Sequence, residues 1–186
     1  MRKLPVLLTL GAVFSMASIH ILAQTGNAKF IGAKKCKMCH MSKKRGDQWN
    51  KWSEGPHSKA FTVLASEESK AIAEKLGLSK DPQQAPECLK CHVTGYGVPA
   101  SAKEASFAPE EEGVGCEACH GAGSLYKSMK VMKALTAGEQ DPKEVGLLDP
   151  NEALCVTCHN EESPTYKPFV FCEAAAKIAH PIPEAE

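Results

Sequence analysis

The sequence lacks three features that mark common classes of protein. It has no excess charge, because 22 lysines and arginines balance 22 aspartates and glutamates in 186 residues, and it gives no sign of a nucleic-acid partner. Beyond residue 22 it has no apolar run long enough to span a bilayer. It also offers little support for strands. These absences leave a small protein of helices and loops.

Cysteine is the residue type that stands out. Eight of the nine cysteines belong to four copies of Cys-x-x-Cys-His. Two thiols at this spacing can bond both vinyl groups of one porphyrin, and the next imidazole can bind its iron. The motifs therefore predict four covalently bound haem c groups. The predicted attachment points are Cys36, Cys39, Cys88, Cys91, Cys116, Cys119, Cys155 and Cys158, and the predicted proximal ligands are His40, His92, His120 and His159.

Two other interpretations of paired cysteines need no histidine. Four Cys-x-x-Cys pairs could build two zinc ribbons, or one pair could be a thioredoxin-like redox site. With only 7 histidines in the chain, a histidine after all four pairs is very improbable by chance. The pattern favours haem attachment.

Residues 1–23 have the pattern of a secretory signal peptide. Arg2 and Lys3 precede a mainly apolar stretch that ends at Ala23, before polar residues. Cleavage there would leave residues 24–186 as one tetrahaem domain. An uncleaved membrane anchor is the alternative, because the apolar stretch is long for a signal peptide. Covalent haem attachment takes place outside the cytoplasm, so leader and motifs both predict a periplasmic protein.

The rest of the chain predicts a mainly α fold, a compact multihaem cytochrome c with little regular structure beyond short helices wrapped around four haems. Helical periodicity runs from Asp47 to Lys75, and Gly77 can end it. The segment 93–115 is rich in glycine, proline, serine and alanine and predicts a long surface loop. The lysine-rich segment 34–45 predicts a solvated face, with docking as the alternative.

Three further helices are expected towards the C-terminus. An apolar stripe predicts one over residues 125–135, ended by Gly138. Asp149 can cap a second, with Pro150 at its first position, just before the fourth motif. A third is predicted over about 169–179.

The remaining histidines are too few to cap every iron. Four of the seven belong to the motifs and His20 lies in the leader, so only His57 and His180 are left as distal ligands. At most two haems can therefore carry two histidines within one chain. Both histidines could instead be ordinary surface or core residues. With four irons in so small a protein, distal ligation is favoured.

Methionine is the next candidate for a sixth ligand, because its thioether binds haem iron and raises the redox potential relative to histidine. Met129 and Met132 follow the third motif at helical spacing, where they can be either ligands or core residues. One iron still lacks an evident sixth ligand and could bind a small molecule. Cys172, the ninth cysteine, is predicted to be a buried inert thiol.

The order and flanks of the motifs resemble the tetrahaem cytochrome c554 family. The resemblance runs from about residue 34 to 180. It is carried by Trp52 and His57 after the first motif, by Cys-His-x-x-Gly-Tyr-Gly at the second, by Gly-Val-Gly-Cys-Glu-Ala-Cys-His-Gly at the third, and by a terminal helix that ends at His180. The resemblance implies a mainly helical fold with haems in close stacked and perpendicular pairs.

The resemblance also implies a ligand set. Three haems are six-coordinate and the second, on Cys88, Cys91 and His92, is open; His57 and His180 become distal ligands. The family places the distal histidine of haem one about ten residues after the third motif, where this chain has Met129. We infer from this departure that Met129 replaces that histidine as the metal ligand. The type member accepts electrons from hydroxylamine oxidoreductase, but this chain is shorter and lacks its basic excess.

Three functions compete at this stage. The first is a periplasmic electron carrier that passes single electrons between respiratory redox proteins, with no catalytic residues of its own. The second is an enzyme that converts nitric oxide, nitrite or hydroxylamine at an open haem two. The third is a haem-bridged oligomer or a subunit of a membrane complex, in which a neighbouring chain completes the open positions. The sequence favours the first.

Overall fold

The computed structural model describes residues 27–181, and the predicted leader, residues 1–23, lies outside the described residues. Within them the chain forms ten short α-helices, the longest of nine residues. They are α1 (Ala33–His40), α2 (Gln48–Glu54), α3 (Ala60–Val63), α4 (Glu67–Lys75), α5 (Pro86–His92), α6 (Pro109–Glu112), α7 (Cys116–His120), α8 (Met129–Thr136), α9 (Glu152–Cys155) and α10 (Phe171–Ile178). Short 3-10 turns lie between them, among them η2 (Lys43–Arg45), η3 (His57–Lys59) and η5 (Gly123–Leu125).

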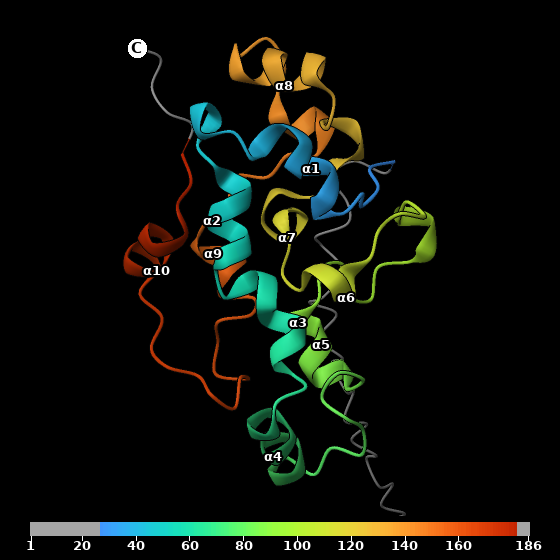
Figure 1. Cartoon of the computed structure of the whole chain (residues 1–186), viewed down its shortest axis with the longest axis vertical. Coiled ribbons are helices and arrows are strands. Elements are labelled where there is room, and N and C mark those ends of the chain that lie inside the picture. The colour runs from blue at the N-terminus through green and yellow to red at the C-terminus, as the bar shows by residue number, and fades with distance from the viewer. Residues whose placement is uncertain (1–26, 182–186) are drawn as a thin grey trace, which may run out of the picture.

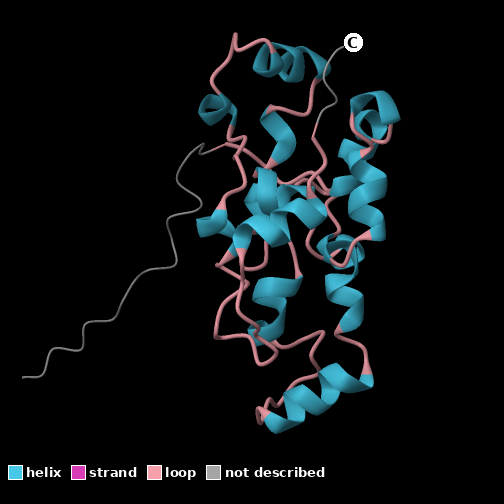
Figure 2. Cartoon of the chain, turned by 90° about the vertical axis from the view of Figure 1, so that its left-hand side faces the viewer, coloured by secondary structure: helices cyan, strands magenta, loops and turns pink. Residues whose placement is uncertain are grey.

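The helices form an elongated body (Figure 1, Figure 2). In Figure 1, α8 and α1 lie at one end, α7 in the middle, α5 below it and α4 at the other end. No strand forms in the described part of the chain; one isolated parallel bridge joins Phe30 to Lys103. The predicted mainly α class is confirmed. None of the described helices has the length and apolar character needed to cross a membrane.

The apolar core of the described residues is very small. Only eight apolar residues are buried, and three of them are alanines: Ile31, Ala33, Leu64, Ala73, Ala85, Val93, Tyr126 and Val145. Side chains this few and this small cannot alone supply the apolar burial that a domain of this size needs. The polypeptide therefore fits a role as a shell around large apolar groups.

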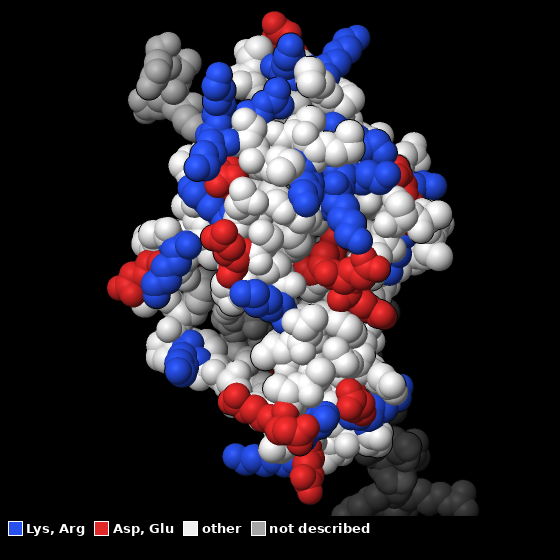
Figure 3. Space-filling view, viewed as in Figure 1, with Lys and Arg blue, Asp and Glu red and all other residues white. Residues whose placement is uncertain are grey.

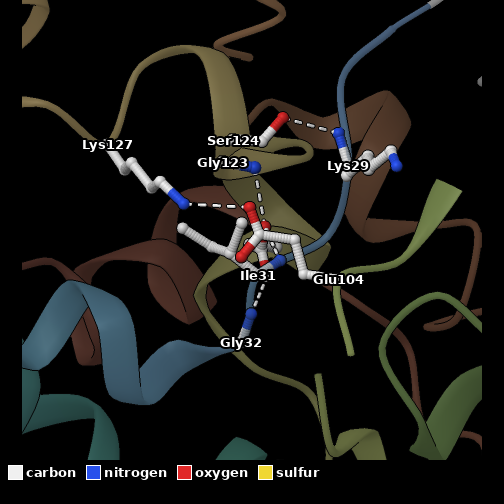
Figure 4. Close-up of polar contacts among 8 residues, drawn as sticks. Lys29, Ile31, Gly32, Glu104, Gly123, Ser124 and Lys127 are labelled. Atoms are coloured by element: carbon white, nitrogen blue, oxygen red, sulfur yellow. Dashed lines mark hydrogen bonds and ion pairs between the residues drawn. The ribbon is translucent and has the colours of Figure 1, made fainter. Parts of the chain in front are cut away.

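Buried carboxylates hold the start of α1 in place. The N–H groups of Ile31, Gly32 and Gly123 donate to Glu117 of α7 at 3.0, 2.7 and 2.6 Å, and Figure 4 shows these three groups converging on one side chain. Glu112 of α6 accepts the N–H of Ala33, the first residue of α1, at 2.5 Å. Both carboxylates sit at the positive end of the α1 dipole. They join the first motif helix to the third.

The chain around Gly113 ties together the second and third motifs. Thr94, which follows α5, donates its hydroxyl to the Gly113 carbonyl at 2.8 Å and accepts the Gly115 N–H at 2.7 Å. Gly113 has a φ of +59°, and a Cβ there would lie 2.9 Å from the His57 carbonyl oxygen. Only glycine satisfies both the backbone angle and the close approach.

Four details differ from the sequence predictions. The helical segment 47–75 is divided into α2, η3, α3 and α4, because Gly55 and Pro56 interrupt it and Ser66 starts a new helix by capping α4. The predicted loop 93–115 carries α6 and is buried at both ends. The predicted 125–135 helix begins only at Met129, where the Ser128 side chain caps α8. Asn151, rather than Asp149, caps α9, since its side chain accepts the Leu154 N–H at 3.1 Å.

Candidate haem-binding sites

The first three Cys-x-x-Cys-His motifs each lie on a short helix that ends at the histidine. α1 ends at His40, α5 at His92 and α7 at His120. Since residues three apart share a helix face, each helix presents its two thiols together. The fourth motif begins on α9 and continues into turns that carry Cys158 and His159. The eight motif cysteines are half-buried, and no disulfide forms within residues 27–181.

Thiols of different motifs lie beside one another. Cys36 of the first motif shares a hydrogen bond with Cys116 of the third, and this bond, ahead of burial, raises the pKa of the Cys116 thiol. Cys91 of the second motif lies against Cys158 of the fourth; burial, then the Cys158 thiolate, raises the pKa of Cys91 to about 11. The third motif also lies near the fourth: the Leu148 N–H, seven residues before Cys155, donates to the His120 carbonyl at 3.0 Å. Burial, and then the charges of Cys155 and Cys158, raises the pKa of Cys119. The motifs thus form one series in the order first, third, fourth, second.

Two histidine pairs have matching spacing. The rings of His57 and His159 have centroids 6.0 Å apart with an interplanar angle of 59°. The rings of His120 and His180 are also 6.0 Å apart, at 73°. Metal–imidazole bonds of about 2 Å on opposite sides of one metal require ring centres roughly 6 Å apart. The spacing of each pair fits an iron between the two rings.

The environment keeps two of these imidazoles neutral. Burial, and then the charge of His159, lowers the pKa of His57. Burial, and then the charge of His180, lowers the pKa of His120. Metals bind the neutral form of imidazole. Both side chains are therefore held in the form that coordinates.

Backbone carbonyls fix the orientation of two histidines. His92 Nδ1 lies 2.6 Å from the Ala60 carbonyl oxygen, and His180 Nδ1 lies 2.8 Å from that of Ile178. A carbonyl can only accept, so Nδ1 carries the proton and Nε2 keeps its lone pair. This arrangement is typical of metal-binding histidines, whose second nitrogen donates to a carbonyl or carboxylate. It leaves Nε2 of both residues as the coordinating atom.

Comparison with known proteins bears on the same features. The family model for "Cytochrome c554 and c-prime" matches residues 35–121, which contain the first three motifs. Cytochrome c-554 of Nitrosomonas europaea is 35% identical over 122 residues, or 64% of this chain, and the match spans about half, 49%, of that relative's length. The solved reduced state of cytochrome c554 from the same organism is 30% identical, covers 82% of this chain and 79% of its own, and superposes with a TM-score of 0.50.

The chain belongs to the cytochrome c554 family. Its cofactors are four covalently bound haem c groups. The predicted fold class, family and cofactors are confirmed by this likeness. The donor sets fit the group independently, since each motif offers two thiols and an imidazole, and the protein alone builds almost no core.

A zinc ribbon, the alternative considered from the sequence, finds no ligand set here. No cluster of three or more histidine, cysteine, aspartate or glutamate side chains that could hold a metal ion forms among residues 27–181. Haem attachment requires only the pair within each motif.

Four sequence-predicted residues, His40, His92, Met129 and Cys172, lie differently from the rest. Among the described residues, neither His40 nor His92 has a second histidine ring stacked or facing it at the spacing of the two pairs. Met129, on the first turn of α8, is 53% exposed, whereas Met132 is half-buried. The expectation that Cys172 is buried was wrong. It lies at the second position of α10 and is exposed, because the apolar side of that helix is formed by Phe171, Ala174 and Ala175.

Sequence reasoning missed two groups that position the histidines. The Phe169 ring stacks on the His159 ring with centroids 4.9 Å apart and planes 15° apart. The Ala60 carbonyl holds His92 across 32 positions of the chain. A lone phenylalanine and a backbone carbonyl carry no sequence signal. Glu117, inside the third motif, is 3% exposed, whereas Lys37 at the same place in the first motif is exposed, so its position between two haem cysteines did not signal its burial.

Proposed function

We propose that this protein is a periplasmic tetrahaem cytochrome that carries single electrons between respiratory redox proteins. The contacts between motifs carry the proposal. Glu117 of the third motif accepts the N–H groups that precede the first, and the Leu148 N–H, which precedes the fourth, donates to the His120 carbonyl of the third. Lys90 of the second motif pairs with Glu162, which follows the fourth. Each haem supplies one-electron chemistry at its iron. The protein's part is to hold four such groups in contact and to set their potentials through the axial ligands.

The attachment residues follow from the motifs. Cys36 and Cys39, Cys88 and Cys91, Cys116 and Cys119, and Cys155 and Cys158 hold haems one to four, and His40, His92, His120 and His159 are their proximal ligands. The short helices support this assignment, since they place both thiols of a motif on one face. We number the haems by their motifs.

The two histidine pairs support distal assignments that the sequence left open. His57 is the distal ligand of haem four, opposite His159, and His180 is that of haem three, opposite His120. His57 belongs to η3, whose carbonyl at residue 57 accepts the Val114 N–H at 3.0 Å, so its backbone is anchored. His180 directly follows α10.

Haems one and two differ from this pattern. The Met129 thioether is the proposed sixth ligand of haem one, in place of the histidine of the family. The alternative ligand is Met132, and the spectra of the two methionine variants in the Discussion distinguish them. Haem two keeps an open position opposite His92, whose proximal imidazole the Ala60 carbonyl orients. A hydrogen bond of this kind makes the imidazole a stronger donor to iron.

The experiment that tests this function counts electrons and turnover together. One sample of the fully reduced protein is titrated with a one-electron oxidant. Further samples are mixed with nitric oxide or nitrite and excess reductant, or with hydroxylamine and an excess of a one-electron acceptor. The proposal predicts four electrons per chain and no multiple turnovers. Sustained turnover of any of the three nitrogen compounds would replace the carrier with an enzyme acting at haem two.

The location is tested separately. A periplasmic protein requires that residues 1–23 direct export and that cleavage follow Ala23. Mass spectrometry of the mature protein should find Gln24 as the first residue, with the mass of four haems added. A mature chain that retains its first residues in the membrane fraction would favour the anchor.

A further inference from the structure

Charge is distributed unevenly over this electrically balanced protein. Exposed cationic side chains gather at the end that carries α1, η2 and α8, where Figure 3 shows many blue side chains among white ones, with the larger groups of acidic side chains lower down on the same face. The cations are Lys35, Lys37, Lys43, Lys44, Arg45, Lys51, Lys130 and Lys133. None of these eight belongs to a salt bridge formed between residues 27–181. Lys37 Nζ lies over the Trp49 ring, 4.9 Å from its centroid, and all eight residues are exposed.

Apolar side chains are exposed among these cations. Met38, inside the first motif, is 80% exposed, and Met41 is 49% exposed. Binding surfaces commonly combine an apolar centre with a polar rim, and methionine side chains adapt to differently shaped partners. We call the eight cations with Met38 and Met41 the α1 surface.

The opposite end of the molecule has a different character. Around α4 and the start of α5, cations alternate with acids: Lys70 pairs with Glu67 at 2.8 Å, and Lys75 and Lys80 lie near Glu74 and Asp81 in the chain. Mixed charges produce little field at a distance. At the end that carries α1, cations predominate on α1, η2 and α8, although exposed Glu139, Asp141 and Glu144 follow α8.

We propose that the α1 surface docks the acidic face of a redox protein and so brings that partner against haem one. This inference rests on the proposed electron-carrier function. The first motif is at one end of the series first, third, fourth, second, so an electron accepted at haem one can pass along all four groups. The cations attract and orient the partner, and the exposed methionines supply the dry contact at the centre.

The charge pattern decides the kind of partner. A cationic surface raises the association rate with an acidic protein by 10-fold or more at low salt, and the effect falls steeply as salt is added. An anionic membrane would also attract cations, but interfacial segments insert large apolar and aromatic side chains. The exposed apolar side chains of the α1 surface are two methionines, a composition that suits a protein contact.

The test uses gold electrodes covered with carboxylate-terminated or hydroxyl-terminated monolayers, with the full tetrahaem protein at low salt. The carboxylate layer stands for the acidic face of a partner. The test variant is Lys43→Glu with Lys44→Glu, on η2. The matched control is Lys75→Glu with Lys80→Glu, which changes the net charge equally at the other end. None of these lysines belongs to a haem motif.

The proposal predicts that the test variant loses at least 10-fold in electron-transfer rate at the carboxylate layer. The control variant should stay within twofold of the wild type, and added salt should reduce the wild-type rate to that of the test variant. Equal losses in both variants would overturn the proposal, since net charge alone would then explain the effect. So would a test variant that exchanges electrons as fast as the wild type.

Two further arms separate the remaining outcomes. The first arm is binding to phosphatidylglycerol vesicles. If the wild type binds them, the test variant does not, and the wild type shows no fast electron exchange at the carboxylate layer, the partner is a membrane and the proposal is overturned. A spectroelectrochemical titration with uncharged mediators shows whether the four haems take up electrons at all. If they do while the electrode rates show no dependence on the α1 surface, the docking proposal fails and the carrier function stands.

Discussion

At the scale of single residues, the two histidine pairs are the most specific part of the account. A spacing of 6.0 Å in both pairs links His57 to the fourth motif and His180 to the third. The sequence could select these two histidines by elimination, because only they remained after the motifs and the leader were counted. It could not pair them, since each lies far from its partner along the chain.

Removing either distal histidine should open one iron and leave the others capped. His57→Ala is expected to convert one low-spin ferric haem to high spin in the electron paramagnetic resonance spectrum, and His180→Ala should convert a different low-spin signal. Added imidazole should restore both. If the two variants lose the same signal, or none, the pairing is wrong.

Methionine ligation of haem one gives a separate spectroscopic prediction. Met129→Leu should abolish the methionine–iron charge-transfer band and lower the potential of one haem, because a thioether favours the reduced iron. Met132→Leu is the matched control on the same helix. Since Met132 is the more buried of the two, loss of the band in that variant instead would transfer the ligand to Met132.

Glu112 should make stability depend on pH. Burial, ahead of other causes, raises its pKa to about 7 from 4.5, and its Oε1 has no hydrogen-bond partner among the described residues. The folded state holds this proton more tightly than the unfolded chain does, so the stabilisation is full below pH 4.5 and declines as pH rises to 7. Between pH 5 and 8, the free energy of unfolding should fall by roughly 1–3 kcal/mol less in Glu112→Gln than in the wild type. Thermal unfolding at several pH values measures this difference.

Exposed Glu110 on the same short helix provides the control for Glu112. Glu110→Gln should keep the wild-type slope of stability against pH, because its side chain is solvated. An unchanged slope in Glu112→Gln as well would show that Glu112 titrates normally in the folded protein.

At the scale of elements, the helices are short because the motifs and their caps divide the chain. Sequence patterns located most of them: Gly77 and Gly138 follow α4 and α8, each with φ near +70°, and α10 lies within its predicted range. The α6 segment was not predicted. It depends on Glu112 reaching Ala33 and on Gly113 fitting against η3, which are contacts between distant parts of the chain.

The Glu117 contact between α7 and the start of α1 should be the strongest single polar contribution to the assembly of these elements. Glu117→Ala leaves the N–H groups of Ile31, Gly32 and Gly123 without their acceptor, at a cost of about 2 kcal/mol or more. Denaturation of the haem-loaded variant measures this cost. Glu87→Ala on α5, an exposed carboxylate, should cost far less; similar losses in the two variants would remove the special role of Glu117.

At the scale of the whole molecule, family, fold class and cofactors could be predicted because the four motifs are unambiguous in sequence. The order in which the motifs meet could not, because it depends on contacts such as Cys36 with Cys116 and Cys91 with Cys158. Neither could the charged end, since α1 and α8, which carry many of its lysines, lie at the same end only in the fold. The order of the motifs and the position of the charged end therefore depend on contacts between distant parts of the chain.

The central claim is that the four haems form one electrically connected series. It is tested most directly by photoreducing the oxidised protein with less than one electron per chain and following the absorbance of the haems in time. The account predicts that the electron redistributes among all four haems, according to their potentials, at a rate independent of protein concentration. A haem that is reduced only in a slower, concentration-dependent phase would contradict it, because electrons would then reach that haem through collisions between molecules.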